Sequence, residues 1–162
     1  MGILVTLDAL FEPAGDVPRA IASAETALER LGWVGRPIVL VGTTLGERRL
    51  PLVDDDRLAW ARHTLGDTAI RIVLFDPPAE ERHADDHAAV KAWRELRGSY
   101  EARWLIHDGG PVAAARRAGL TVIAVGGRSV GGVERADHDA RDLLDAANHV
   151  LMTEAFRPRV TS

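Results

Sequence analysis

The chain has 162 residues, a formal net charge of −4 and a pI near 5.8. It has no cysteine, which excludes a disulfide framework, a thiol nucleophile and a zinc site built on thiolates. Against nineteen arginines it has a single lysine, Lys91. The length predicts one domain over residues 1–162. Charges of both signs are interleaved without a basic stripe, so we expect no nucleic-acid partner.

We do not interpret the first residues as a targeting signal. Their short apolar run has no basic flank and no cleavage-like site. Gly2 and Thr6 match the bare N-myristoylation pattern, but the same residues are better interpreted as a buried strand. No apolar run approaches the ~20 residues that span a bilayer. We therefore expect a cytoplasmic protein without a membrane partner, and the sequence leaves its oligomeric state open.

The apolar pattern alternates between strand and helix along the chain. Buried strands are expected over residues 3–7, 38–41, 70–75, 104–106 and 120–125, and a short sixth over 149–152. Helices are expected over residues 17–31, 54–65, 85–98, 111–118 and 137–147. Asp16 is expected to cap the first helix and Gly32 to end it. This alternation predicts an α/β fold, a three-layer doubly wound parallel sheet of Rossmann-like type with strand order 3-2-1-4-5.

Polar residues follow three of these strands. Asp8 follows the first strand, Thr43 and Thr44 follow the second, and His107-Asp108 follow the fourth. Ligands bind at the carboxyl ends of parallel strands next to the switch point, so these side chains are expected at one crevice. His107 is either a hydrogen-bonded structural histidine or a functional one, and the sequence leaves both open.

Three segments carry a resemblance to a known family. They are Ile3-Leu4-Val5-Thr6-Leu7-Asp8-Ala9-Leu10-Phe11, Val39-Leu40-Val41-Gly42-Thr43-Thr44 and Leu105-Ile106-His107-Asp108-Gly109-Gly110, the last followed by an alanine-rich helix ending in Ala118-Gly119. Their order and spacing over residues 3–125 resemble the first, second and last motifs of the haloacid dehalogenase-like superfamily. Those motifs are a strand before Asp-x-Asp-Gly-Thr, a strand ending in Thr or Ser, and a strand ending in Gly-Asp.

The resemblance implies a phosphohydrolase fold that uses Mg²⁺. In this family the first aspartate attacks phosphorus and the second acts as acid and base, which divides the hydrolysis into two steps. The metal neutralises the charge on the phosphoryl oxygens, while a Thr or Ser hydroxyl and a lysine hold the phosphoryl group.

The first motif can be placed on this chain in two registers. In one, Asp8 takes the place of the second aspartate and Thr6 that of the nucleophile. In the other, Asp8 is the nucleophile and Leu10 stands where the acid is needed. Either way one of the two carboxylates is missing, and a Thr6 hydroxyl without a base is expected to be inactive.

The motif positions that hold the phosphoryl group in the family correspond to residues in the middle of this chain. Thr43 and Thr44 occupy the place of the second motif's hydroxyl. Arg82 stands where the lysine is expected, and Lys91 is the alternative. Arginine can hold a phosphate by its charge, so this exchange leaves the role intact.

The metal-binding positions of the family correspond to residues of the last motif. Asp108 matches its first aspartate, with His107 at the place of the preceding glycine, and Val112 replaces its second acid. Asp108 and Asp8 would form a weak site for Mg²⁺, which prefers several carboxylate and water oxygens.

The resemblance therefore implies a hydrolase relative with an eroded active site and, because little chain separates the first two strands, at most a minimal cap. At most it is a weak or divergent Mg²⁺-dependent phosphohydrolase that acts on a phosphorylated small molecule. The alternative is a catalytically inactive module that binds a ligand or a protein partner. A third interpretation is a serine hydrolase using Ser129, because residues 127–131 match Gly-x-Ser-x-Gly, but too few residues follow to supply its remaining strands.

Overall fold

The computed structural model describes residues 1–11, 20–35, 37–42, 63, 70–74, 87–107, 113–126 and 136–157. Within these ranges a single parallel sheet has the strand order β3-β2-β1-β4-β5-β6. The strands are β1 (Ile3–Thr6), β2 (Ile38–Gly42), β3 (Ile70–Leu74), β4 (Trp104–His107), β5 (Thr121–Val125) and β6 (His138–Ala140). The predicted α/β class with a parallel sheet is confirmed.

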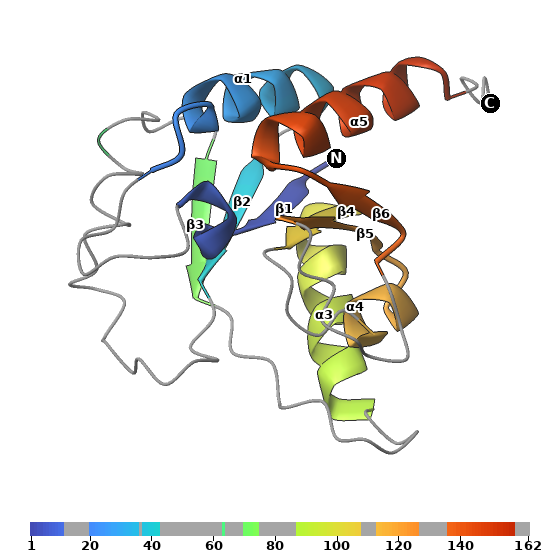
Figure 1. The fold of residues 1–162 in the computed structure, drawn as a ribbon. Coiled ribbons are helices and arrows are strands. Elements are labelled where there is room, and N and C mark those ends of the chain that lie inside the picture. Colours follow the sequence, from blue (N-terminus) through green and yellow to red (C-terminus); the bar gives the residue numbers. More distant parts are fainter. Residues whose placement is uncertain are drawn as a thin grey trace.

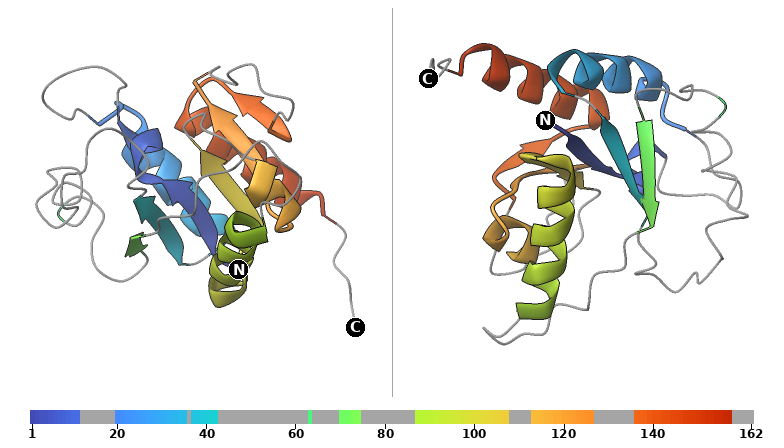
Figure 2. Two further views of the ribbon diagram at one scale, coloured as in Figure 1. Left: turned by 90° about the horizontal axis from the view of Figure 1, so that it is seen from below. Right: turned by 180° about the vertical axis from the view of Figure 1, so that it is seen from behind.

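Helices cover both faces of this sheet, which gives three layers (Figure 1). The helices are α1 (Ala24–Val34), α3 (His87–Tyr100), α4 (Ala113–Arg117) and α5 (Leu143–Ala155). Figures 1 and 2 show α1 and α5 side by side over one face, and α3 and α4 over the other. In the part of the chain that the structure describes, no helix is long and apolar enough to cross a membrane.

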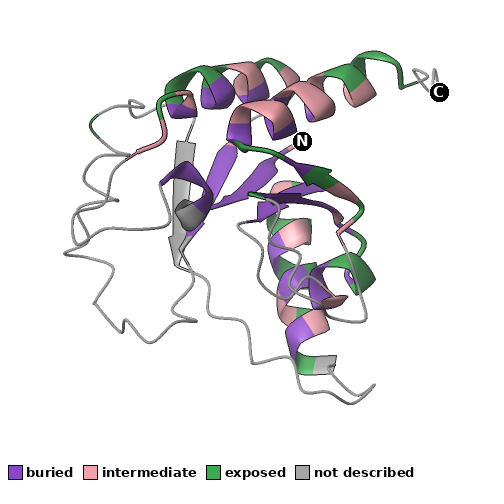
Figure 3. Cartoon of the chain, viewed as in Figure 1, coloured by how far each residue is buried: buried purple, intermediate pink, exposed green. Residues whose placement is uncertain are grey.

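Strand β1 lies at the centre of the sheet and is buried on both faces (Figure 3). Its first residue, Ile3, pairs with Ile38 of β2 on one side and with Trp104 of β4 on the other. This short apolar run could be recognised in the sequence because a strand covered on both faces needs no polar alternation. The strand order reverses at β1, with β2 on one side and β4 on the other, and this reversal creates the switch point where ligands bind in such sheets.

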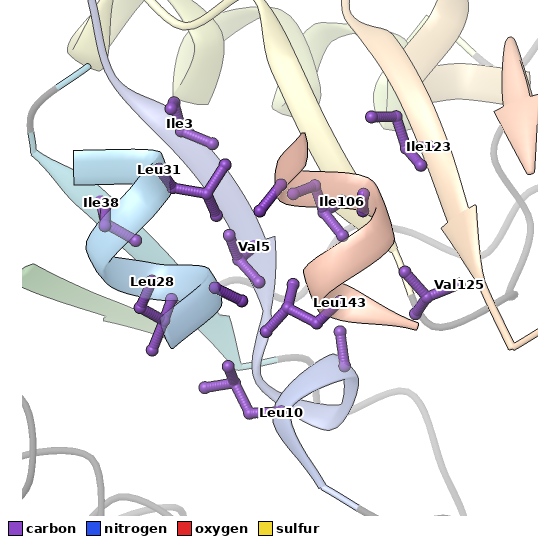
Figure 4. Close-up of a cluster of buried hydrophobic side chains, with 14 of the residues drawn as sticks. Ile3, Val5, Leu10, Leu28, Leu31, Ile38, Ile106, Ile123, Val125 and Leu143 are labelled. Carbon is purple, nitrogen blue, oxygen red and sulfur yellow. The ribbon is translucent and has the colours of Figure 1, made fainter. Parts of the chain in front are cut away.

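Alternating side chains of the strands form two separate cores. Ile3, Val5, Leu40 and Ile106 pack under α1 and α5, with Leu31 and Leu143 from those helices (Figure 4). Leu4, Val39, Val41 and Leu105 pack under α3 and α4, with Trp93 from α3 and Ala115 from α4. Each fully buried aliphatic side chain of this kind contributes about 1.5–3 kcal/mol, so both cores hold the sheet firmly.

The amino end of β1 is held by close backbone approaches. Gly2 donates its N–H to the Tyr100 carbonyl oxygen at the end of α3, at 2.8 Å. Gly35, which follows α1, lies so near the Met1 carbonyl oxygen that a Cβ at this position would overlap it. Glycine at both positions therefore lets the ends of α1 and α3 reach β1.

The prediction for residues 137–152 was wrong. Residues expected to begin a helix form β6, and the expected strand over 149–152 lies inside α5. Asp137 explains the difference, because its N–H donates to the Val122 carbonyl at 2.9 Å and its Oδ2 accepts the Val122 N–H at 2.8 Å. Helix α5 begins only after Asp142, whose Oδ1 accepts the Asp145 N–H at 2.8 Å and caps it.

The boundaries of the first helix also differ from the prediction. The helix continues through Gly32 to Val34, and Gly35 is the residue that ends it, with its N–H donating to the Leu31 carbonyl. The expected cap Asp16 lies outside the described residues, as does the expected helix over 54–65 apart from residue 63. The other described elements match their predicted ranges to within about two residues, the usual spread of boundary assignments.

Candidate functional site

The last residues of β1 and β4 lie beside each other at the carboxyl edge of the sheet. Val5 of β1 pairs with Ile106 of β4, so the next residues, Thr6 and His107, reach the same level of the sheet. Neighbouring strands lie about 4.8 Å apart, which makes these two residues direct neighbours. On its other side Thr6 pairs with Val41 of β2.

Thr6 and His107 also point to the same face of the sheet. Leu4 and Leu105 belong to the core under α3 and α4, and side chains two residues apart on a strand share a face. Thr6 follows Leu4 by two residues, and His107 follows Leu105 by two. A hydroxyl and an imidazole therefore meet at the switch point on the α3 side.

Both side chains are buried, and the Thr6 hydroxyl has no partner among the described residues. Thr6 is 3% exposed and His107 8%, and no other described polar or charged residue is buried to this degree. Within the described ranges Oγ1 of Thr6 has no hydrogen-bond partner. Leaving a buried hydroxyl unpaired costs about 1–3 kcal/mol, and folded proteins normally satisfy such groups. The hydroxyl is therefore a group that a ligand at this edge would satisfy.

A single turn of 3₁₀ helix, η1 (Leu7–Leu10), follows β1 and carries the backbone of Asp8 (Figure 1). Ala9 and Leu10 are buried in the core under α1 and α5, which fixes the turn against the sheet. The chain thus places Asp8 directly beyond Thr6, but its side chain is outside the described part. Its predicted role as acid, nucleophile or metal ligand stays a prediction.

The remaining predicted residues are distributed as follows. The phosphate-binding candidates Thr43, Thr44 and Arg82, the metal candidate Asp108 and the serine candidate Ser129 lie outside the described residues. Two of them adjoin described strand ends, because β2 ends one residue before Thr43 and β4 one residue before Asp108. Their roles stay predictions.

Lys91, the alternative to Arg82, lies on α3 and is exposed. The buried residues of α3 are Ala89, Trp93 and Leu96, and they face the sheet. Lys91 therefore does not share the face of α3 that packs on the strands.

The described residues do not fit a magnesium ion. Among them no group of three or more His, Asp or Glu side chains is arranged to hold a metal. Thr6 offers a neutral hydroxyl and His107 a ring nitrogen, whereas Mg²⁺ demands oxygen ligands and is usually bound through carboxylates. A magnesium site at this edge would need ligands from outside the described side chains, such as Asp8 and Asp108.

A second polar cluster lies at the other end of β4, and the sequence interpretation missed it. The rings of His138 on β6 and His149 on α5 stack with centroids 3.7 Å apart and planes 6° apart. The ring of Trp104 lies nearly perpendicular to that of His149, and its indole N–H donates to Glu154 Oε1 at 2.8 Å. Burial, then the neighbouring His138, lowers the pKa of His149, while Asp145 opposes this shift. The cluster ties α5 to the sheet.

Comparisons with known proteins identify a solved structure with a similar fold. No family model and no curated protein matches the sequence. Among solved structures, the chain matches a D,D-heptose 1,7-bisphosphate phosphatase from Burkholderia thailandensis with a TM-score of 0.64. The match covers 93% of this chain and 97% of that one, at 15% sequence identity. The chain therefore shares its overall fold with that phosphatase.

Proposed function

We propose that this chain is a relative of the haloacid dehalogenase-like hydrolases that binds a phosphorylated small molecule at the carboxyl ends of β1 and β4. The observation that carries the proposal is the buried hydroxyl of Thr6 at the end of β1, which has no hydrogen-bond partner among the described residues. In the motif register with Asp8 as the second aspartate, Thr6 stands at the place of the attacking carboxylate. A threonine hydroxyl there can donate a hydrogen bond to a phosphoryl oxygen.

The same residue explains why the proposed activity is at most weak. A carboxylate is an anionic nucleophile at neutral pH, whereas a threonine hydroxyl needs an adjacent base to react. The full proposal assigns acid–base work to Asp8 and phosphate binding to Thr43, Thr44 and Arg82. In this proposal Asp8 and Asp108 hold any Mg²⁺, which would neutralise charge on the phosphoryl oxygens.

Restoring the missing carboxylate tests the proposal directly. The variant Thr6→Asp recreates the Asp-x-Asp pattern with Asp8. We expect Mg²⁺-dependent hydrolysis of a generic aryl phosphate at least about a hundredfold above that of the unchanged protein, because removing a nucleophile typically costs far more than this. Thr6→Asn is the matched control, with the same shape as aspartate but no charge, and it gains nothing.

Three outcomes distinguish the interpretations. A gain in Thr6→Asp that is lost again in Thr6→Asp/Asp8→Asn supports an eroded phosphohydrolase site. Rapid hydrolysis by the unchanged protein that survives Thr6→Asn and is lost in Asp8→Asn would overturn it in favour of Asp8 as the nucleophile. No binding of any phosphate ester by the folded protein would overturn it in favour of an inactive protein-binding module.

A further inference from the structure

We infer that His107 and Thr6 together bind the phosphoryl group of the ligand directly and without a divalent metal. The inference rests on the proposed function and adds a second ligand-binding residue and a metal-independent mode of binding. His107 has no counterpart in the family motif, where glycine precedes the aspartate.

The first argument is the placement of the two side chains. They end adjacent strands at the same level, because Val5 pairs with Ile106 one residue earlier. They share the α3 face of the sheet, because Leu4 and Leu105 do so two residues earlier. A single oxyanion at this edge can therefore meet both side chains.

The second argument is their chemistry. A threonine hydroxyl and an imidazole ring N–H are both hydrogen-bond donors, and a phosphoryl oxygen is an acceptor. Both residues are more than nine-tenths buried, and hydrogen bonds to an ionised group are stronger in such surroundings than in water. The ligand would also satisfy Oγ1 of Thr6, which lacks a partner within the described part of the chain.

The third argument is that the described surroundings suit an anion better than a cation. The neighbours of Thr6 and His107 on their face are Leu4, Val41 and Leu105, which offer no side-chain oxygen. Replacing a carboxylate by Thr6 removes a negative charge that would hold a metal and would repel a phosphate. Magnesium gives up its water reluctantly, so it gains little from a neutral hydroxyl.

Calorimetric titration with inorganic phosphate tests this inference, once in EDTA and once in excess Mg²⁺. We expect the same Kd within about twofold in the two conditions. Thr6→Val and His107→Gln are each expected to weaken binding by about tenfold or more, the usual effect of losing a hydrogen bond to a charged group. Thr121→Val, which changes a half-buried threonine at the opposite end of the sheet, is the matched control and leaves Kd unchanged.

A spectroscopic measurement keeps the test valid if His107→Gln folds poorly. In protein labelled with ¹⁵N-histidine, phosphate in EDTA is expected to shift the imidazole resonances of His107 and leave those of His138 unchanged. Binding that appears only with Mg²⁺ would overturn the inference and leave the proposed function standing. An unchanged Kd in folded His107→Gln, or unmoved His107 resonances at saturation, would also overturn it. Absence of phosphate binding in both conditions would overturn the inference, and absence of binding for phosphate esters as well would overturn the proposed function itself.

Discussion

Replacing Thr6 with valine gives the sharpest single test of the site, because the two side chains have nearly the same shape. The substitution removes only the hydroxyl that is buried and unpaired within the described part of the chain. An unsatisfied buried hydroxyl costs about 1–3 kcal/mol, so we expect Thr6→Val to stabilise the ligand-free protein by this amount. A domain of this length gains roughly 2–4 °C in Tm for each kcal/mol, which predicts a rise of about 2–12 °C.

The ligand narrows the difference between the two proteins. Phosphate at a hundred times its Kd stabilises a binding protein by about 2.7 kcal/mol, and at the same concentration a variant that binds tenfold more weakly gains only about 1.4 kcal/mol. Differential scanning calorimetry with and without phosphate measures both effects in one series. Thr121→Val, on β5, serves as the control and is expected to keep the full response to phosphate.

A destabilised Thr6→Val would refute this reasoning. A fall in the free energy of unfolding by 1 kcal/mol or more in the ligand-free variant, about the worth of one satisfied hydrogen bond, would mean that the hydroxyl has a partner within the folded chain. The candidate site would then lose the observation on which it rests. An unchanged response to phosphate in the variant would equally exclude Thr6 from the binding site.

Three further predictions concern the scaffold. The pKa of His149 is lowered in the folded protein, so the unfolded chain binds more protons below about pH 6.5. Chemical unfolding should therefore show full stability above that pH and a loss of stability below it, and His149→Phe should reduce this loss. An unchanged dependence of stability on pH in His149→Phe would mean that the histidine stacked on His138 does not cause the loss. Gly35→Ala should lower the free energy of unfolding by about 1–3 kcal/mol, since its Cβ would overlap the Met1 carbonyl, and a neutral result in urea unfolding would contradict that close approach. Asp142→Ala should cost about 1 kcal/mol in the same assay by removing the cap of α5, and no loss would mean that the cap is not formed.

The central strands could be predicted from the sequence for a clear physical reason. A strand that is covered on both faces must be apolar at every position, and β1 and β4 meet this condition up to their last residues. The sequence accordingly places His107 directly after the fourth strand, whereas it places Thr6 inside a first strand that in the structure ends one residue earlier than predicted. The expectation that ligand-binding residues follow these strands came from topology alone.

The carboxy-terminal part could not be predicted in this way. Strand β6 is three residues long and reads His138-Asp139-Ala140, which gives no apolar run to recognise. Its place depends on the paired hydrogen bonds between Asp137 and Val122, which are fifteen positions apart in the sequence. Local sequence patterns do not report contacts between distant segments. The predicted helix therefore began too early, at residue 137, and ended too early, at residue 147.

Whether the Thr6 hydroxyl has a hydrogen-bond partner could also not be predicted from the sequence. The motif places a threonine at the end of β1, but whether its oxygen is satisfied depends on every group that packs around it. The same limit applies to the stack between His138 and His149, which needs both the edge strand and α5 in position.

The parallel pairing of β1 with β4 has a consequence for how the protein is made. His107 leaves the ribosome only about a hundred residues after Thr6, so the two sides of the site can meet only after the intervening chain has been made. Contacts between such distant segments form slowly, because a long loop must close before they contribute any stability. A nascent or truncated chain that ends before β4 leaves one edge of β1 unpaired, with its backbone donors and acceptors available for other strands. Ligand binding at Thr6 and His107 would therefore distinguish completed molecules from partly folded ones.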